Sequence, residues 1–345
     1  MKIVDFEIGK NKTFIVAELS ANHNGSLETA IKTIEAAKRA GADAIKLQTY
    51  RADTISVNSN SDKFIIKGDT LWDGLSYYEL YDKAHTPWQW HETLKKVAND
   101  LGLILFSSPF DKTAVDFLEK LNMPAYKIAS FEINDLPLIE YTASFGKPII
   151  ISTGVATKEE IMDACNVCRK VGNNNIILLK CTSSYPAPLE EANLIMIKQM
   201  AKDFNVLTGL SDHTLNNIVS TTAVALGACM VEKHFILDKS INSPDNKFSL
   251  DEFELKEFID NIRLVESAIG NNSYNISDLS KKNRHFMRSL YAIKDIEKGE
   301  VFSYSNISSF RPNLGISLKY LGDIIGKKAK DKIIKNTPIN FNLID

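Results

Sequence analysis

Eight short apolar segments, each followed by a segment with helical periodicity, constrain the fold of this chain more than any other feature. The apolar segments are rich in β-branched residues and lie at 14–19, 44–49, 104–109, 125–130, 148–153, 176–181, 206–211 and 229–235. Continuous apolarity is typical of strands that are buried on both faces of a parallel sheet. Eight β-then-α units within about 250 residues predict an α/β fold of the (β/α)₈ TIM barrel type. An open doubly wound sheet is the alternative, but no glycine-rich turn opens the first helix.

The barrel pattern ends near Gly270, and the rest of the chain has a different character. We predict a barrel over 1–270, a polar linker over 271–283 and a small β-rich domain over 284–345. Within the last domain, runs at 288–296 and 301–312 predict short strands, and the run at 317–329 predicts a helix.

Charge is divided unequally between the two parts. Residues 281–345 hold 13 Lys or Arg against 6 Asp or Glu, a balance of +7, whereas residues 1–280 hold 28 against 37, a balance of −9. A solvated basic tail explains this asymmetry. A basic lid that meets an anionic ligand on the larger domain explains it equally well.

Composition excludes several classes of protein. The chain has no apolar run of eighteen or more residues, so we expect no membrane span. Residues 1–12 lack the pattern of a secretory signal, and four cysteines do not make a disulfide framework, so we expect a cytoplasmic protein. We expect neither a nucleic acid nor a membrane as its partner. Cys165 and Cys168 form a CxxC pair inside a predicted helix, and we interpret them as helix packing and solvent face rather than as a zinc or redox site.

One connection is much longer than the others. Residues 50–86 separate the second predicted strand from the next helix and are rich in Trp and Tyr. Connections of this length in a compact domain are usually functional or disordered, and the aromatic residues favour an ordered segment. Because it follows a strand, we expect it on the catalytic face of the barrel.

Every predicted strand ends in polar residues, although an apolar strand has no packing reason to do so. In strand order they are Glu18; Lys46 and Gln48; Ser107 and Ser108; Lys127 and Ser130; Ser152 and Thr153; Lys180 and Thr182; Ser211, Asp212 and His213; and Glu232 and His234. Active sites of these barrels lie at the carboxyl ends of the strands. We therefore predict that these side chains meet there in one site.

The residue types in this set indicate two kinds of chemistry. Lysines and hydroxyls suit a small phosphorylated or carboxylated anion. Lys46 or Lys127 as a Schiff-base nucleophile is an equally good interpretation at this point.

Two histidines predict a metal site. His213 and His234 end neighbouring strands, which lie about 4.8 Å apart in a sheet, so both rings can reach one divalent ion such as Mn²⁺, Zn²⁺ or Fe²⁺. Two separately hydrogen-bonded histidines are the alternative. His23 faces the same site without an assigned role. The histidines with no comparable setting, which we predict to lie on the surface, are His85, His91 and His285.

Eight ordered motifs resemble those of the sialic acid synthase family. They read AELSANHNG, KLQTY, FSSPF, AYKIASFE, STG, CTSSYP, GLSDH and VEKHF, and the tail from Arg288 resembles the antifreeze-like (SAF) domain of that family. The resemblance covers nearly the whole chain. It implies a transferase that condenses phosphoenolpyruvate with an N-acetylated amino sugar and releases phosphate.

The resemblance also implies roles for individual residues. Phosphoenolpyruvate would be bound by Lys46, Ser108, Lys127, Ser130, Ser152 and Ser211. The metal, usually Mn²⁺ with Mg²⁺ or Co²⁺ as alternatives, would be held by His213 and His234. The positions that would meet the metal-bound water or the sugar are Glu18, Gln48, Tyr185 and Asp245. Of all these residues, Glu18, His213 and His234 would be catalytic.

Two further expectations come from the same resemblance. Arg311 would be offered to the acetamido group of the sugar by the partner subunit of a domain-swapped homodimer. Glu132 and Glu232 match acidic positions of the family without a firm role.

Within the family, residues 63–91 and 238–254 are most similar to pseudaminic acid synthases. N-acetylneuraminate synthases have an Asn where this chain has Ser183, and a sugar-binding Asn where it has the segment GDTLWDG at 68–74. A sugar with a methyl group in place of a hydroxyl prefers an apolar contact, for which Trp72 is the candidate. This indicates 2,4-diacetamido-2,4,6-trideoxy-L-altrose as the substrate, with N-acetylneuraminate or legionaminate synthesis as the alternative. The rivals from other classes are a Schiff-base lyase and a carbohydrate-binding protein without catalysis.

Overall fold

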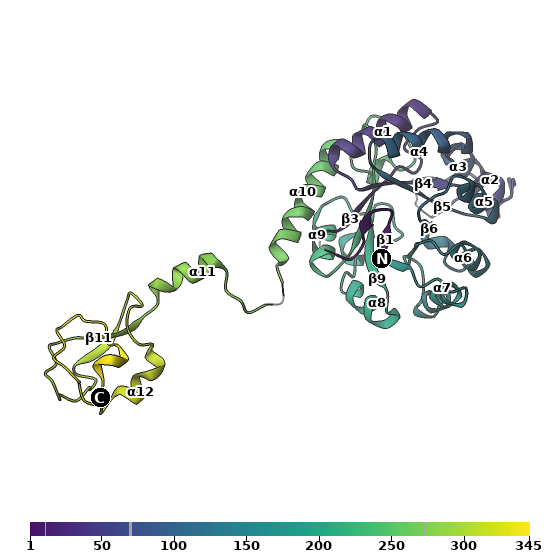
Figure 1. The fold of residues 1–345 in the computed structure, drawn as a ribbon. Helices are drawn as coiled ribbons and strands as arrows, with labels where there is room; N and C mark the ends of the chain where they lie inside the picture. Colours follow the sequence, from purple (N-terminus) through teal and green to yellow (C-terminus); the bar gives the residue numbers. More distant parts are fainter. Residues whose placement is uncertain (11, 69–70, 272) are drawn as a thin grey trace. The chain divides into compact units, whose positions relative to one another are not determined.

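The computed structural model describes residues 1–10, 12–68, 71–271 and 273–345 and divides them into two compact units, Met1–Gly270 and Asn271–Asp345 (Figure 1). Asp69 and Thr70, within the GDTLWDG segment, and Asn272, within the predicted linker, lie outside the described residues.

The first unit is a closed barrel of parallel strands, which confirms the predicted fold. Each strand pairs with the next in the chain, and the last pairs with the first to close the ring. The strands are β3 (Phe14–Glu18), β4 (Ala44–Thr49), β5 (Ile104–Pro109), β6 (Tyr126–Ile128), β7 (Ile149–Ser152), β8 (Ile176–Cys181), β9 (Leu207–Asp212) and β10 (Met230–His234). Their ends agree with the eight apolar segments within one residue, except that β6 ends two residues earlier, because continuous apolarity locates a strand that is covered on both faces.

Helices surround this ring, as Figure 1 shows. They are α1 (Leu27–Ala40), α4 (His91–Asp100), α5 (Lys112–Lys120), α6 (Leu136–Ala143), α7 (Lys158–Lys170), α8 (Met196–Phe204), α9 (Ile218–Ala225) and α10 (Glu252–Ile269). Local signals set their ends. Helix α1 begins after Ser26, whose hydroxyl accepts a hydrogen bond from the Thr29 N–H, and ends at Gly41, which has a φ of 98°.

Alternation along each strand separates two sets of side chains. Ile45 and Leu47 of β4 belong to the core between the strands and the helices. Ala44 belongs to the core inside the barrel, and because side chains alternate, Lys46 and Gln48 share its inward face. The interior is therefore apolar near the amino ends of the strands and polar near their carboxyl ends.

A hairpin that the sequence did not predict closes the amino end of the barrel. Its strands, β1 (Lys2–Ile3) and β2 (Phe6–Glu7), are antiparallel. Ile3 and Ile8 are buried in the interior core together with Phe14 and Val16. Two-residue strands are too short to show periodicity, so only packing reveals them.

The long connection after β4 is largely structured, as its aromatic residues predict. Its described part contains α2 (Ala52–Ile55), the short 3₁₀ segment Asp62–Phe64 and α3 (Tyr77–Ala84), and a second 3₁₀ segment, Trp88–Trp90, follows it. Ser76 caps α3 by accepting from the Glu79 N–H, and Glu79 accepts in return from the Ser76 N–H.

The second unit contains a two-stranded antiparallel sheet, β11 (Ser289–Ala292) and β12 (Ile307–Phe310), with helices α11 (Asp278–Asn283) and α12 (Leu321–Ile324). The helix predicted over 317–329 is wrong in extent. A 3₁₀ turn at Leu318–Tyr320 precedes the four-residue α12, and Gly326, with a φ of 91°, follows it. The apolar residues of this run pack into the small core instead, which includes Ile324 and Ala329.

Within the described part of the chain, no helix is long and apolar enough to cross a membrane.

Candidate active site

Four buried charges meet inside the barrel at the carboxyl ends of the strands. They are Glu18 on β3, Lys46 on β4, Lys127 on β6 and Glu232 on β10, and none is more than 4% exposed. Lys46 forms an ion pair with Glu18, its neighbour in the strand register. Lys127 Nζ donates to the two oxygens of Glu232 at 3.0 and 3.1 Å, and Lys46 Nζ lies 3.6 Å from Glu232 Oε1. Two cations and two anions therefore balance within one cluster.

This cluster gives its two carboxyl groups different proton affinities. Burial raises the pKa of Glu18 above its ordinary range, although Lys46 opposes the shift. Burial alone would also raise the pKa of Glu232, but Lys127 and Lys46 lower it to about 2. Glu232 is thus a firmly ionised partner for the lysines, whereas Glu18 is suited to take up a proton.

The two lysines also differ. Burial alone would lower the pKa of Lys46, but Glu18 and Glu232 together raise it above its ordinary value. Burial lowers the pKa of Lys127, although the Glu232 carboxylate opposes the shift.

Four serine hydroxyls surround the charges. Ser108 accepts from Lys46 at 3.3 Å, and Ser211 donates to Glu232 at 3.4 Å. Ser130 accepts from the Gly154 N–H at 3.2 Å. The Ser152 hydroxyl is buried and has no hydrogen-bond partner. A buried hydroxyl without a partner costs free energy unless a ligand satisfies it, so this one indicates a bound anion.

The glycine of the STG motif makes room beside these serines. A Cβ added at Gly154 would lie 2.2 Å from Ser183 Oγ and 2.9 Å from Ser130 Oγ. The backbone can approach the site this closely only because position 154 has no side chain.

The two histidines lie together, with ring centroids 5.3 Å apart. His213 Nδ1 is 3.0 Å from the Thr182 carbonyl, which can only accept, so this nitrogen carries a proton and Nε2 is the ring nitrogen that a metal could use. His234 Nδ1 is buried without a hydrogen-bond partner, 3.6 Å from Asp245 Oδ2.

This pair fits an open metal site better than a closed one. The described residues contain no group of three or more His, Cys, Asp or Glu side chains placed to hold a metal. Two imidazoles would leave several positions for water or substrate, which is typical of catalytic centres.

Aromatic residues form one wall above the histidines. The Tyr185 ring lies 4.5 Å from that of His213 and 5.1 Å from that of Phe248, and the Trp72 ring lies 6.0 Å from Tyr185. Trp72 comes from the long connection, so the structure brings that segment to the carboxyl end of the barrel, as predicted.

Three other predicted site residues, Gln48, Asp245 and Arg311, lie in three different parts of the chain. Gln48 shares the inward face of β4, two residues beyond Lys46, and is partly buried. Asp245 is buried in the connection after β10, near the Ala21 N–H at 3.5 Å. Arg311 is exposed in the second unit. Its role at a sugar stays a prediction.

Some of the strand-end residues do not join the site, contrary to the prediction. Lys180, Asp212 and Thr153 alternate with inward-facing neighbours and therefore point outward. Lys180 Nζ donates to the Cys181 carbonyl at 2.7 Å, and Thr153 Oγ1 donates to the Leu179 carbonyl at 3.0 Å. Asp212 instead forms a buried ion pair with Lys233 at 3.1 Å.

The surface assignment of one histidine is also wrong. His91 is fully buried, and its Nε2 lies 2.8 Å from Thr49 Oγ1, which in turn lies 2.7 Å from Ser107 Oγ. Burial lowers the pKa of His91 to about 4. This chain of polar contacts lies behind the strand ends that carry Gln48 and Ser108. His285 is exposed as predicted, and His85 is partly buried.

The cysteines divide into packing residues and one site residue. Cys165 and Cys168 are both fully buried in one core, so neither lies on a solvent face as we had expected of the pair. All four cysteines are free thiols. Cys181, which sequence reasoning missed, faces inward with Sγ 3.8 Å from His213 Nδ1. Burial alone would raise its pKa, but His213 lowers it to about 7. Strand alternation from Leu179 was the signal that could have identified it.

Comparison with known proteins identifies the family to which the chain belongs. Residues 33–274 match the NeuB family model, and residues 287–345 match the SAF domain model. The chain is 50% identical over 333 residues to the pseudaminic acid synthase of Campylobacter jejuni, covering 96% of each protein. It is 48% identical over 332 residues to the pseudaminic acid synthase of Helicobacter pylori, covering 96% of this chain and 97% of that protein.

A solved structure resembles the whole chain. The crystal structure of the spore coat polysaccharide biosynthesis protein SpsE of Bacillus subtilis superposes with a TM-score of 0.68 at 32% identity, covering 100% of this chain and 99% of that one.

Proposed function

The chain belongs to the NeuB family and ends in a SAF domain, and from this premise we propose that it is a pseudaminic acid synthase. In this proposal it condenses phosphoenolpyruvate with 2,4-diacetamido-2,4,6-trideoxy-L-altrose to give pseudaminic acid and phosphate. The observation that carries the proposal is the 50% identity, over nearly the full length, to the pseudaminic acid synthase of Campylobacter jejuni. The buried lysine and serine cluster supports it independently.

The cluster is suited to hold phosphoenolpyruvate. Lys46 and Lys127 supply positive charge for its phosphate and carboxylate, and the unpartnered Ser152 hydroxyl supplies a donor. Held there, C3 of phosphoenolpyruvate is positioned to form the new carbon–carbon bond with the aldehyde carbon of the open-chain sugar.

Binding of this anion would change the state of Glu18. In the structure Glu18 is paired with Lys46, and an anionic ligand competes for that lysine. The buried Glu18 carboxylate then loses its nearest cation, which raises its proton affinity further. Glu18 can accept the proton of the water that adds to C2. The bond between C2 and the phosphate oxygen then breaks, the C2 hydroxyl gives its proton to the departing phosphate, and a 2-keto acid remains.

The histidines would hold a divalent cation, for which we propose Mn²⁺, with Mg²⁺ or Co²⁺ as alternatives. Bound by His213 and His234, it would supply Lewis-acid polarisation of the sugar carbonyl. Asp245 lies 3.6 Å from His234, and its carboxylate can orient that ring.

Trp72 would set the preference for a 6-deoxy sugar. Its ring and that of Tyr185 form an apolar surface. A methyl group can pack there without losing a hydrogen bond, whereas a hydroxyl group would be left without a hydrogen-bond partner. We also propose a cytoplasmic, domain-swapped homodimer in which Arg311 of one subunit contacts the acetamido group bound by the other.

The test is turnover on a panel of sugars. The full chain is incubated with phosphoenolpyruvate and Mn²⁺, with either N-acetylmannosamine or one of several diacetamido-trideoxy hexoses, and phosphate release is followed together with product mass. We expect turnover of the L-altro sugar and, in Trp72→Ala, a smaller ratio of that rate to the rate with N-acetylmannosamine. Turnover of N-acetylmannosamine alone would overturn the proposal. Borohydride trapping with pyruvate provides the control, because covalent labelling of Lys127 would indicate a lyase.

A further inference from the structure

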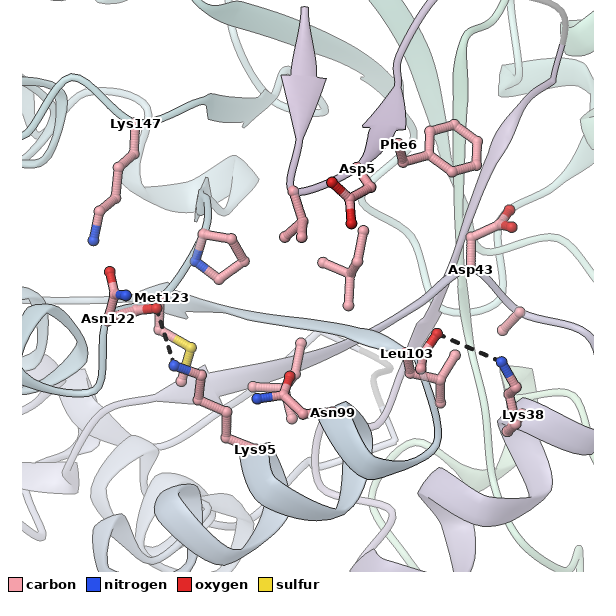
Figure 2. Close-up of a pocket in the computed structure, with 16 residues that line it drawn as sticks. Asp5, Phe6, Lys38, Asp43, Lys95, Asn99, Leu103, Asn122, Met123 and Lys147 are labelled. Carbon is pink, nitrogen blue, oxygen red and sulfur yellow. Dashed lines mark hydrogen bonds between the residues drawn. The ribbon is translucent and has the colours of Figure 1, made fainter.

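A second pocket lies at the opposite end of the barrel from the candidate active site. Its volume is about 760 Å³, within the usual range for small-molecule sites. Asp43, Leu103, Pro124 and Lys147 line it, and each stands at or just before the amino end of a strand. The turn of the β1–β2 hairpin forms its far wall (Figure 2). Nothing in the reaction proposed above uses this pocket.

Three lysines line the pocket although the barrel as a whole is acidic. Figure 2 shows Lys95 and Lys147 on one side, with Asn122, and Lys38 on the opposite side. Lys147 is paired with Glu119 at 2.9 Å. Among the residues that the structure describes, Lys38 and Lys95 make no ion pair with a carboxylate. Their charge is left for a ligand.

Some of the N–H donors of Lys38 and Lys95 already form hydrogen bonds with backbone carbonyls. Lys95 Nζ donates to the Leu121 carbonyl and, at 3.0 Å, to the Asn122 carbonyl, so it caps the end of α5. Lys38 Nζ donates to the Gly102 carbonyl at 3.5 Å. An ammonium group has three N–H donors, so Lys95 retains one and Lys38 retains two. Burial, and then the nearby charge of Lys147, lowers the pKa of Lys95, as expected for a cation without a counter-ion.

Two carboxylates also line the pocket, Asp5 and Asp43, and Asp43 is already paired with Lys12 and Arg263. The rest of the lining suits the body of a small molecule. Phe6 and Pro124, which are partly exposed, provide apolar contact between the lysines, whereas Leu103 and Met123 are buried, and Asn99 adds an amide. An apolar lining with a few convergent polar groups is the usual composition of a ligand site.

The hairpin turn adds a separate observation. Val4, which lines the pocket, has a φ of 53° and is 57% exposed. A β-branched residue in this conformation is an outlier that costs roughly 1–2 kcal/mol. Such backbone strain is concentrated at ligand sites, because a strained conformation persists only where other interactions offset its free-energy cost.

We propose that this pocket binds a phosphorylated small molecule with an apolar or planar body, of about the size of a nucleotide. The phosphate lies between Lys95, Lys147 and the Asn122 amide. The body lies against Phe6 and Pro124 and extends toward Lys38.

Isothermal titration calorimetry with nucleoside monophosphates and inorganic phosphate tests this on the full chain. Lys38→Gln and Lys95→Gln remove one pocket charge each. Lys96→Gln is the matched control, because Lys96 is an exposed neighbour on the same helix that does not line the pocket. Lys127→Met removes an anion-binding charge at the other end of the barrel. Thermal unfolding of each variant reports whether the lost cap of α5 affects folding, and Lys38→Gln leaves that cap intact.

We expect at least one monophosphate to bind more tightly than inorganic phosphate, and to bind Lys127→Met and Lys96→Gln as it binds the wild type. Its affinity should fall about tenfold in Lys38→Gln and in Lys95→Gln, as for the loss of one charge-assisted hydrogen bond. Three results would overturn the proposal: no probe binds, binding is unchanged in both pocket variants, or binding disappears in Lys127→Met.

Discussion

Two buried lysine–carboxylate clusters occupy the same end of the barrel on opposite faces of its strands. The inner cluster is the set of four charges described above, Glu18, Lys46, Lys127 and Glu232, and the outer one is the pair of Lys233 and Asp212. Residues 232 and 233 are adjacent on β10, so alternation alone sends one inward and the other outward. The clusters are similar in burial and composition and differ in how completely their polar groups are satisfied.

The outer cluster is saturated. Asp212 accepts from the Thr214 N–H at 2.8 Å and from the Ser220 hydroxyl at 2.6 Å, in addition to its pairing with Lys233. Around the inner cluster, by contrast, the Ser152 hydroxyl and His234 Nδ1 are buried without hydrogen-bond partners. A saturated buried network stabilises a fold, whereas an unsatisfied one indicates the place of a ligand. Polarity at a strand end is therefore not sufficient to identify a site residue.

The largest difference between the clusters should appear in activity. We expect Lys127→Met to lower the rate of phosphate release about a thousandfold or more, because it removes a charge that we propose binds the substrate anion. Its stability should fall less than that of the outer-cluster variant below, since Lys46 still lies 3.6 Å from Glu232 and Glu18, whose pKa burial raises, can take up a proton. Lys180→Met is the matched control, a lysine near the end of β8 that faces outward, and it should retain most of the activity. Comparable losses in both variants would contradict the distinction.

Stability should depend more on the outer cluster than on the inner one. We expect Lys233→Met to lower the free energy of unfolding by about 3–5 kcal/mol, because Asp212 would remain buried without its cation. Urea denaturation of the purified variant measures this. The double variant Asp212→Asn with Lys233→Met should recover part of the loss, since it removes both charges. A loss below about 1 kcal/mol in the single variant would mean that the outer pair is no more structural than the inner one.

A smaller effect should come from the neutral polar chain of His91, Thr49 and Ser107. The pKa of His91 is about 4 in the folded protein, against 6.5 for a free side chain. Between these values the unfolded chain binds more protons, so stability is complete above pH 6.5 and is lost as the pH falls toward 4. The contribution is at most about 3 kcal/mol.

His91→Gln tests this by urea denaturation across pH 4 to 7, because its amide can still bond Thr49 without titrating. We expect the variant to lose less stability than the wild type over this interval. Burial lowers the pKa of His23 to about 4 and raises that of Glu132 to about 7, and both groups contribute the same pH dependence in the two proteins. Parallel pH profiles would contradict the assignment of His91.

The sequence predicted the barrel because its signal is local and repeated eight times. It also located the inner cluster, since polar residues at the ends of apolar strands are conspicuous. It could not separate Ser211 from Asp212 in function, because the facing direction of a strand is fixed by pairing with its neighbours. It missed the burial of His91, which depends on how α4 packs against β4 and β5. It overextended the helix near Ile324, because the same apolar spacing serves the small core of the tail.

The hairpin at the amino end has a kinetic consequence. Ile3 and Ile8 close the floor of the barrel, so among the described residues the interior is reached from the carboxyl end. A molecule held by Lys46 lies deeper than one held beside Tyr185, which belongs to the connection beyond β8. Because the barrel interior is open only at the carboxyl end, a molecule bound beside Tyr185 blocks the entry of the molecule that binds Lys46. We therefore expect a compulsory order of addition, in which the small anion is admitted first and the sugar follows.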